Sequence, residues 1–192
     1  MSTYPIRTRR WTRKEYDRLI ELGILHEDEP IELLAGQLIV AEPKTPLHST
    51  GTGLAGDVLR QAFGDGWLVC IHSPIALDDE SEPEPDVAVV TGVPRDYRDA
   101  HPDRAALVVE VAHTRVSFDR DHKGSLYARA GVADYWIVNL VDRVVEVRRR
   151  PGPDPTADFG AAYAETEIAR PGETLTPLAK PDARVAVDDL LP

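Results

Sequence analysis

The chain has 192 residues, 42% of them hydrophobic and 29% charged, and its 33 acidic against 22 basic side chains give a formal net charge of −11. The length and composition predict one folded domain over residues 1–192, with a core from about 12 to 150 and C-terminal edge strands at 160–192. No apolar run approaches the roughly 20 residues of a membrane span, and no apolar segment follows Met1–Arg10, so we expect a cytoplasmic protein without membrane attachment.

The first half of the chain predicts helices, a hairpin and a strand. Thr12-Arg-Lys-Glu15 is a capping box, because the threonine hydroxyl and the glutamate carboxylate can each accept a backbone N–H at the start of a helix that runs to about Leu22. Ile31–Val40 is typical of two short strands that turn at Ala35-Gly36. The other elements expected here are a helix at 46–63, a strand at 67–77 and an acidic turn at 78–84.

The second half contains short apolar stretches of the kind that form strands buried on both faces of a sheet. These are Asp86–Val90, Ala105–Ala112 and Tyr135–Asn139. Ser117 is a candidate N-cap for a helix to Ala130. The remaining expectations are a half-exposed strand at 143–148, a loop at 151–159 and one or two edge strands with a short terminal piece at 161–191. This order predicts an α/β (α+β) fold with a central mixed sheet flanked by helices.

Three charged residues stand in places where charge is costly. Glu110 lies within the apolar stretch Leu107–Val111, where an ionised carboxylate must be paired, hydrogen-bonded or bound to metal. Asp86 follows Pro85 at the start of a strand, and Lys123 falls on the apolar side of its helix. Each also has a structural interpretation: a satisfied buried glutamate, a turn aspartate, and a helical ion pair of Lys123 with Asp119.

Four segments resemble the Uma-two family of restriction endonucleases in the PD-(D/E)XK superfamily. They are Glu84–Val90, Leu107–Val111, Asp121–Val132 and Asp134–Leu140, and the upstream Ile31–Leu38 and the region of His48 also fit. The resemblance implies a restriction-endonuclease-like core and a metal-dependent endonuclease that hydrolyses phosphodiester bonds in DNA. It also makes a homodimer the expected assembly, because cutting both strands favours two sites related by two-fold symmetry.

The resemblance also implies roles for individual residues. Asp86, Glu110 and Lys123 would be catalytic, and Asp86, Glu110 and Glu32 would hold Mg²⁺ or Mn²⁺. The family's lysine ordinarily lies two residues beyond the acidic residue, where this chain has Ala112, so the pattern points to Lys123 on the following helix. The candidate accessory residues are His48, His113, Asp119 and Tyr127.

Two other functional classes remain open from the sequence. The chain has the wrong net charge for binding phosphates, and the segment after Glu110 departs from the family's Ser-Pro-Ser-like turn, reading Ala112-His-Thr-Arg-Val-Ser117. Both features favour a non-catalytic module that binds nucleic acid or protein while keeping the nuclease fold. The other alternative is an interaction protein in which the polar residues form only a structural network.

Overall fold

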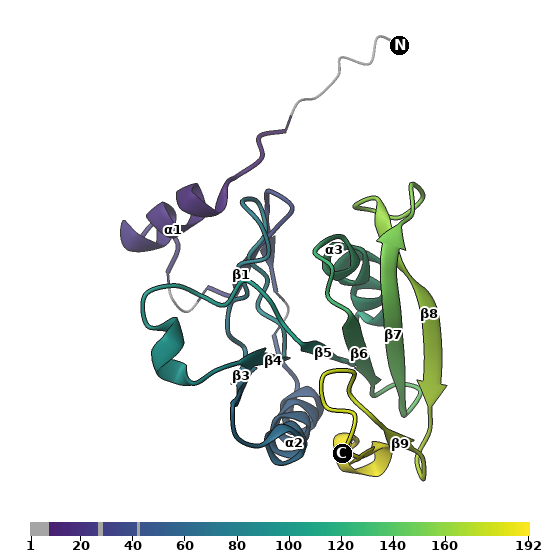
Figure 1. Cartoon of the computed structure of the whole chain (residues 1–192). Coiled ribbons are helices and arrows are strands. Elements are labelled where there is room, and N and C mark those ends of the chain that lie inside the picture. Colours follow the sequence, from purple (N-terminus) through teal and green to yellow (C-terminus); the bar gives the residue numbers. More distant parts are fainter. Residues whose placement is uncertain (1–7, 27–28, 42) are drawn as a thin grey trace, which may run out of the picture.

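The computed structural model describes residues 8–26, 29–41 and 43–192. Residues 1–7, which carry most of the N-terminal segment considered above, lie outside this description. Within the described residues the central sheet has six strands in the order β3-β4-β5-β6-β7-β8 (Figure 1), and neighbouring strands are antiparallel except for β5 and β6. The sheet strands are β3 (Trp67–Ile71), β4 (Val87–Thr91), β5 (Leu107–Ala112), β6 (Asp134–Asn139), β7 (Val144–Pro153) and β8 (Ala161–Ala169).

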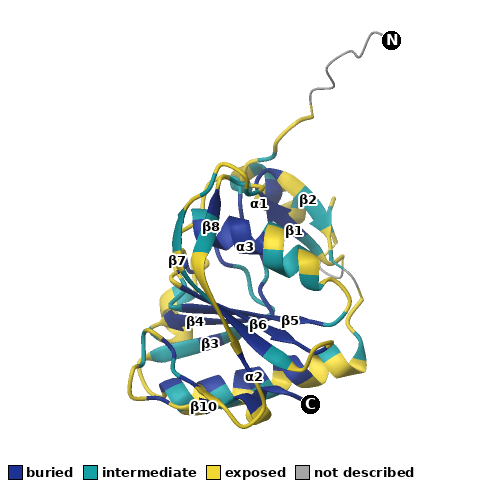
Figure 2. Ribbon diagram, turned by 90° about the vertical axis from the view of Figure 1, so that its right-hand side faces the viewer, coloured by how far each residue is buried: buried dark blue, intermediate teal, exposed yellow. Residues whose placement is uncertain are grey.

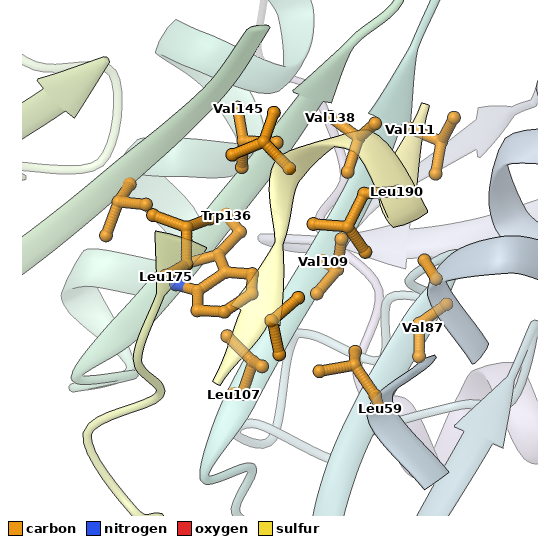
Figure 3. Close-up of a cluster of buried hydrophobic side chains, with 14 of the residues drawn as sticks. Leu59, Val87, Leu107, Val109, Val111, Trp136, Val138, Val145, Leu175 and Leu190 are labelled. Atoms are coloured by element: carbon orange, nitrogen blue, oxygen red, sulfur yellow. The ribbon is translucent and has the colours of Figure 1, made fainter. Parts of the chain in front are cut away.

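Helices and short strands cover both faces of this sheet. The further elements are α1 (Arg13–Glu21), β1 (Ile31–Leu34), β2 (Gln37–Val40), α2 (Pro46–Phe63), η1 (Pro94–Tyr97), η2 (Phe118–Lys123), α3 (Gly124–Arg129), β9 (Thr174–Leu175), β10 (Val185–Ala186) and η3 (Val187–Leu190). On one face α2 and the C-terminal segment pack on the sheet, where Leu59, Val109, Trp136 and Leu190 meet in one core cluster (Figure 3). The opposite face carries α3 and the β1–β2 hairpin, so the mixed α/β architecture is confirmed.

The parallel pair β5–β6 requires a crossover connection, and η2 with α3 supplies it. Both strands are buried throughout their length, as the apolar stretches predict (Figure 2). Asp86, just before β4, and Glu110, within β5, are therefore buried between the sheet and the crossover helix. This arrangement brings the charged residues singled out in the sequence into one region.

The elements predicted before residue 64 are present in the structure. Thr12 and Glu15 form the predicted capping box of α1, and β1 and β2 pair as a hairpin. The turn between them places Ala35 and Gly36 at φ of 48° and 77°, a left-handed pair that matches the twist of a hairpin. Helix α2 spans the predicted residues, 46–63.

Several predicted boundaries were wrong. The strand expected at 67–77 ends at Ile71, because His72 takes a left-handed conformation (φ 47°) and Pro74, which has no N–H, follows closely. The strand expected to be half-exposed at 143–148 has Val145, Glu146 and Val147 all buried, and it continues to Pro153, inside the segment read as a loop.

The helix expected to start at Ser117 also differs. Ser117 already has helical dihedral angles and makes no capping hydrogen bond through its side chain, and the first six helical residues form a π-helix, η2, before α3 begins. At the C-terminus the edge strand β8 is present, followed by the short pair β9–β10. Among the described helices none combines the length and apolarity needed to cross a membrane.

Candidate active site

Two carboxylates lie side by side on adjacent strands. Asp86 directly precedes β4 and Glu110 lies in β5, and the pairing of Val87 with Val109 sets these strands in register. The backbone N–H of Asp86 donates to Glu110 Oε2 (3.3 Å), while the N–H of Val111 donates to Asp86 Oδ2 (2.8 Å). The sheet itself therefore fixes the distance between the two acidic side chains.

Lys123, at the end of η2, faces these carboxylates from the crossover. Its ammonium lies 3.1 Å from Glu110 Oε1 and 3.2 Å from Glu32 on β1. Tyr127, one turn further along, donates its hydroxyl to the same Glu110 oxygen at 2.7 Å. The helix thus turns Lys123 toward the sheet, where it links two carboxylates that are far apart in sequence.

The protonation preferences of this cluster follow from burial and charge. Burial raises the pKa of Glu110 to about 8, with Lys123 opposing the rise and Asp86 adding to it. Burial favours the neutral form of Lys123, but Glu110 and Glu32 outweigh it and raise the pKa of that ammonium. Lys123 is therefore cationic. For Glu110, the nearby ammonium does not outweigh burial, which favours the protonated carboxyl group.

Asp86 has the opposite preference because two histidines hold it. Burial again favours the neutral acid, yet hydrogen bonds from His48 and His72 keep the pKa of Asp86 well below its usual range. His48 Nε2 lies 3.1 Å from Oδ2, and His72 Nε2 lies 3.1 Å from Oδ1. The family resemblance pointed to His48, whereas no motif or spacing in the sequence marks His72.

The π-helix that presents Lys123 is held by donors from the sheet. Gly124 N–H donates to the carbonyl of Asp119, while Tyr135 Oη (2.9 Å) donates to that same carbonyl and Arg148 Nη1 (2.8 Å) donates to the carbonyl of Arg120. These side-chain donors come from β6 and β7 and satisfy carbonyls that an α-helix would use internally. The wider turn follows from these contacts, and such π segments are frequent at functional sites.

The cluster forms the floor of a pocket. Glu32, Asp86, Glu110 and Lys123 line it together with the accessory candidates His48, His113 and Asp119, whereas Tyr127 lies behind Glu110. His113 Nδ1 is 3.4 Å from Thr45 Oγ1, and burial raises the pKa of Asp119 to about 6. Lys44, which the sequence reading missed, also lines the pocket; no motif marks it, because it stands alone in a loop before α2.

The donor set fits a hard divalent cation by its chemistry. Mg²⁺ prefers oxygen ligands and needs only one or two protein carboxylates when substrate phosphate and water complete its shell. Asp86 and Glu110 provide such a pair, and a bound cation would favour the ionised form of Glu110, whose pKa burial raises. Within the described residues no group of three or more His, Cys, Asp or Glu side chains is spaced to enclose an ion, so a fully protein-made cage is not present.

The site thus combines a mixed sheet, two buried carboxylates and a lysine that faces them. Residues 13–188 match the family model Uma2, whose description reads "Putative restriction endonuclease". The chain therefore belongs to the Uma2 family, the one that its motifs resemble.

A comparison with solved structures gives the same fold. The chain is similar to a protein from Anabaena variabilis ATCC 29413 described as "a putative nuclease belonging to DUF820", with a TM-score of 0.67 and 18% sequence identity. The match covers 88% of this chain and 94% of the other. No curated protein matches the chain.

Proposed function

We propose that this protein is a metal-dependent endonuclease that hydrolyses phosphodiester bonds, with DNA as its substrate. The observation that carries the proposal is the buried ammonium of Lys123, 3.1 Å from Glu110, on a carboxylate pair that the sheet holds rigidly. Titratable groups with strongly shifted pKa values that converge in a pocket mark a candidate functional site, and two carboxylates and a lysine do so here.

Asp86 and Glu110 would hold Mg²⁺ or Mn²⁺, and Glu32 would act beside them through its ion pair with Lys123. When bound, the metal supplies a more acidic water and positive charge beside the phosphate. Asp86 is kept ionised by His48 and His72 and is therefore ready to bind a cation. Tyr127 orients Glu110 by its hydrogen bond.

Lys123 would assist the hydrolysis directly. A water oxygen attacks phosphorus, the bond from phosphorus to the leaving sugar oxygen breaks, and the proton released by the water ends on that leaving oxygen. The Lys123 ammonium, which its neighbours keep charged, orients the attacking water and stabilises the negative charge that develops on the phosphate.

A cleavage assay tests this proposal. Labelled DNA is incubated with the wild type in Mg²⁺, in Mn²⁺ and in EDTA, and with Asp86→Asn, Glu110→Gln and Lys123→Met. We expect metal-dependent cleavage by the wild type and a loss of about 100-fold or more in each variant. The matched control, Glu165→Gln, removes an exposed carboxylate that pairs with Arg150 away from the pocket and should cleave normally.

Two results would contradict the proposal. Cleavage that persists in Glu110→Gln would place the activity elsewhere or in a contaminant. DNA binding without cleavage in any metal would favour the non-catalytic module. The homodimer remains a prediction of the family resemblance, and sedimentation velocity tests it.

A further inference from the structure

The reactive groups lie deep in their pocket. Asp86, Glu110 and Lys123 are only 7%, 3% and 7% exposed, and Glu32 is buried beside them. A phosphodiester can reach these side chains only by entering the pocket between the β1–β2 hairpin and the segment that follows β5. This depth restricts the kind of nucleic acid that fits.

Duplex DNA is a poor match for such a pocket. It is stiff, with a persistence length of about 150 base pairs, and it presents its phosphates on the outside of a rod. Bending or opening it costs free energy that proteins commonly recover through many lysine and arginine contacts to phosphate. Among the described residues, the lining of the pocket has five carboxylates and three Lys or Arg side chains: Glu32, Glu84, Asp86, Glu110 and Asp119 against Lys44, Arg115 and Lys123.

The basic run Arg148–Arg150, which lies outside the pocket, offers little compensation.

 Of the Arg148–Arg150 run, Arg148 donates to the carbonyl of Arg120, Arg149 pairs with the buried Asp134, and Arg150 pairs with Glu165. Arg148 and Arg149 are engaged within the fold, whereas Arg150 is exposed and forms a surface ion pair with Glu165. The run therefore does not offer three free cations to the backbone of a duplex.

The lining of the pocket includes both apolar and polar residues. Its apolar lining comprises Leu34, Ile39 and Val40 of the hairpin with Phe118 of η2, and Val40 is 65% exposed. Its polar lining includes Lys44, Thr45 and His113. Lys44 lines the pocket together with Glu84 and Asp86, and burial lowers the pKa of its ammonium while these carboxylates oppose the shift.

We infer that the pocket accepts a nucleotide from a single-stranded nucleic acid or from an unpaired strand end. The phosphate of this nucleotide lies against Lys44, and its base contacts the apolar lining. A single strand bends freely, so one phosphate can enter while its neighbours remain outside. Apolar and aromatic side chains can contact the face of any base. Binding of this kind does not require a basic groove as wide as a duplex. This inference rests on the proposed nuclease function.

The test uses labelled oligonucleotides of about 20 nucleotides, a length that exceeds the usual single-strand site. One is single-stranded, one is the blunt duplex of the same sequence, and one is a duplex with an unpaired tail. Binding is measured by fluorescence anisotropy in Ca²⁺, and cleavage is measured separately in Mn²⁺. We expect the single strand and the tailed duplex to bind at least about tenfold more tightly than the blunt duplex, the effect of about one base contact.

Variants locate the binding site. Val40→Asp changes the apolar lining, and Lys44→Gln removes the cation. Each variant should weaken single-strand binding about tenfold. Val141→Asp is the matched control, since Val141 is 60% exposed but lies outside the pocket. It should bind like the wild type.

The outcomes separate this inference from the proposed function. Preferential binding of single strands without cleavage would leave the inference standing and overturn the nuclease proposal. Equal or tighter binding of the blunt duplex would overturn the inference even if cleavage occurs. Failure to bind any of the oligonucleotides, or equal effects of Val40→Asp and Val141→Asp, would also overturn it.

Discussion

Asp86 is held in place by donors from three separate parts of the chain. His48 comes from α2, His72 follows β3, and the N–H of Val111 comes from β5. His72 reaches Asp86 from a left-handed backbone position (φ 47°), which is uncommon for residues other than glycine, asparagine, aspartate and histidine. Both the backbone conformation of His72 and its side chain can therefore contribute to the position of Asp86.

Replacing His72 with asparagine separates these two features. Asparagine tolerates the left-handed conformation, but its shorter side chain cannot keep the 3.1 Å contact with Asp86 Oδ1. We expect Mn²⁺ affinity to fall about tenfold, as for other residues that orient a metal ligand, with the free energy of unfolding changed by less than about 1 kcal/mol. Calorimetry and urea unfolding measure the two quantities, with the exposed His101→Asn as control. Unchanged metal affinity would show that His72 does not position Asp86.

Glu110 gives a prediction about pH. Its pKa rises from 4.5 to about 8 on folding, so between these values the folded protein keeps a proton that the unfolded chain has released. The free energy of unfolding must then fall as pH rises through this range. Relative to Glu110→Gln, which cannot titrate, the metal-free wild type should lose stability from about pH 4.5 to about pH 8. Urea unfolding in EDTA measures this difference, and parallel pH profiles of the two proteins would contradict it.

Sequence reasoning at the residue scale found the groups that carry charge but not all of their neighbours. Glu110 and Lys123 were conspicuous because each stands where a charge is costly, and the structure brings them together with Asp86 and Glu32. Their catalytic and metal-binding roles remain predictions. His72 and Lys44 were missed because nothing in their local sequence distinguishes them from ordinary loop residues; only the fold brings them to the pocket.

At the scale of elements, predictions succeeded where local chemistry determines the conformation. The capping box of α1 and the turn between β1 and β2 depend on residues within a few positions of one another. The π-helix η2 depends on Tyr135 and Arg148, which lie on later strands and donate to its carbonyls. A local pattern cannot reveal such donors, so a helix was predicted in the right place but with the wrong start and the wrong hydrogen bonding.

Helix α2 tests packing beneath the site through two of its glycines. A Cβ at Gly51 would lie 2.9 Å from Val111 Cγ1, next to the strand that carries Glu110, whereas a Cβ at Gly53 would meet nothing within 4 Å. Gly53→Ala should therefore stabilise the protein by about 1 kcal/mol through helix propensity. Gly51→Ala should destabilise it by about 1–2 kcal/mol through overpacking against a stiff β-branched side chain. Urea unfolding of both variants checks the pair, and stabilisation by Gly51→Ala would contradict the packing described.

At the scale of the whole molecule, the C-terminal segment completes the core. Leu175 and Leu190 pack over Trp136 and Val109 (Figure 3), and Asp134 in β6 accepts the N–H of Leu178 at 2.8 Å. This segment was expected only as edge strands and a terminal piece, because two-residue strands carry too little periodicity to predict. Its contribution to the core makes the prediction of one domain over residues 1–192 testable.

Asp134 provides that test. It is fully buried and accepts hydrogen bonds from Trp136, Arg149 and Leu178, so Asp134→Ala leaves the buried Trp136 indole and two part-buried donors without their acceptor. We expect a loss of about 3 kcal/mol in the free energy of unfolding, with a single cooperative transition in both proteins. Thermal unfolding followed by both tryptophan fluorescence and circular dichroism measures this. A separate early transition of the C-terminal segment would contradict the single-domain prediction.

The net charge of −11 also belongs to this scale. It suggested that binding to nucleic acid would be weak, and the carboxylates that line the pocket concentrate part of that charge around the site. A bound divalent cation reverses the local field, so metal binding should precede or accompany the binding of a phosphate. The metal is thus the condition on which the proposed chemistry depends.

The most direct measurement is a calorimetric titration of Mn²⁺ into the wild type, Glu110→Gln and the control Glu165→Gln. We predict binding to the wild type and to Glu165→Gln, and loss of that binding in Glu110→Gln, because Glu110 is half of the carboxylate pair on the pocket floor. Equal binding by Glu110→Gln, or none by the wild type, would contradict a metal site at Asp86 and Glu110.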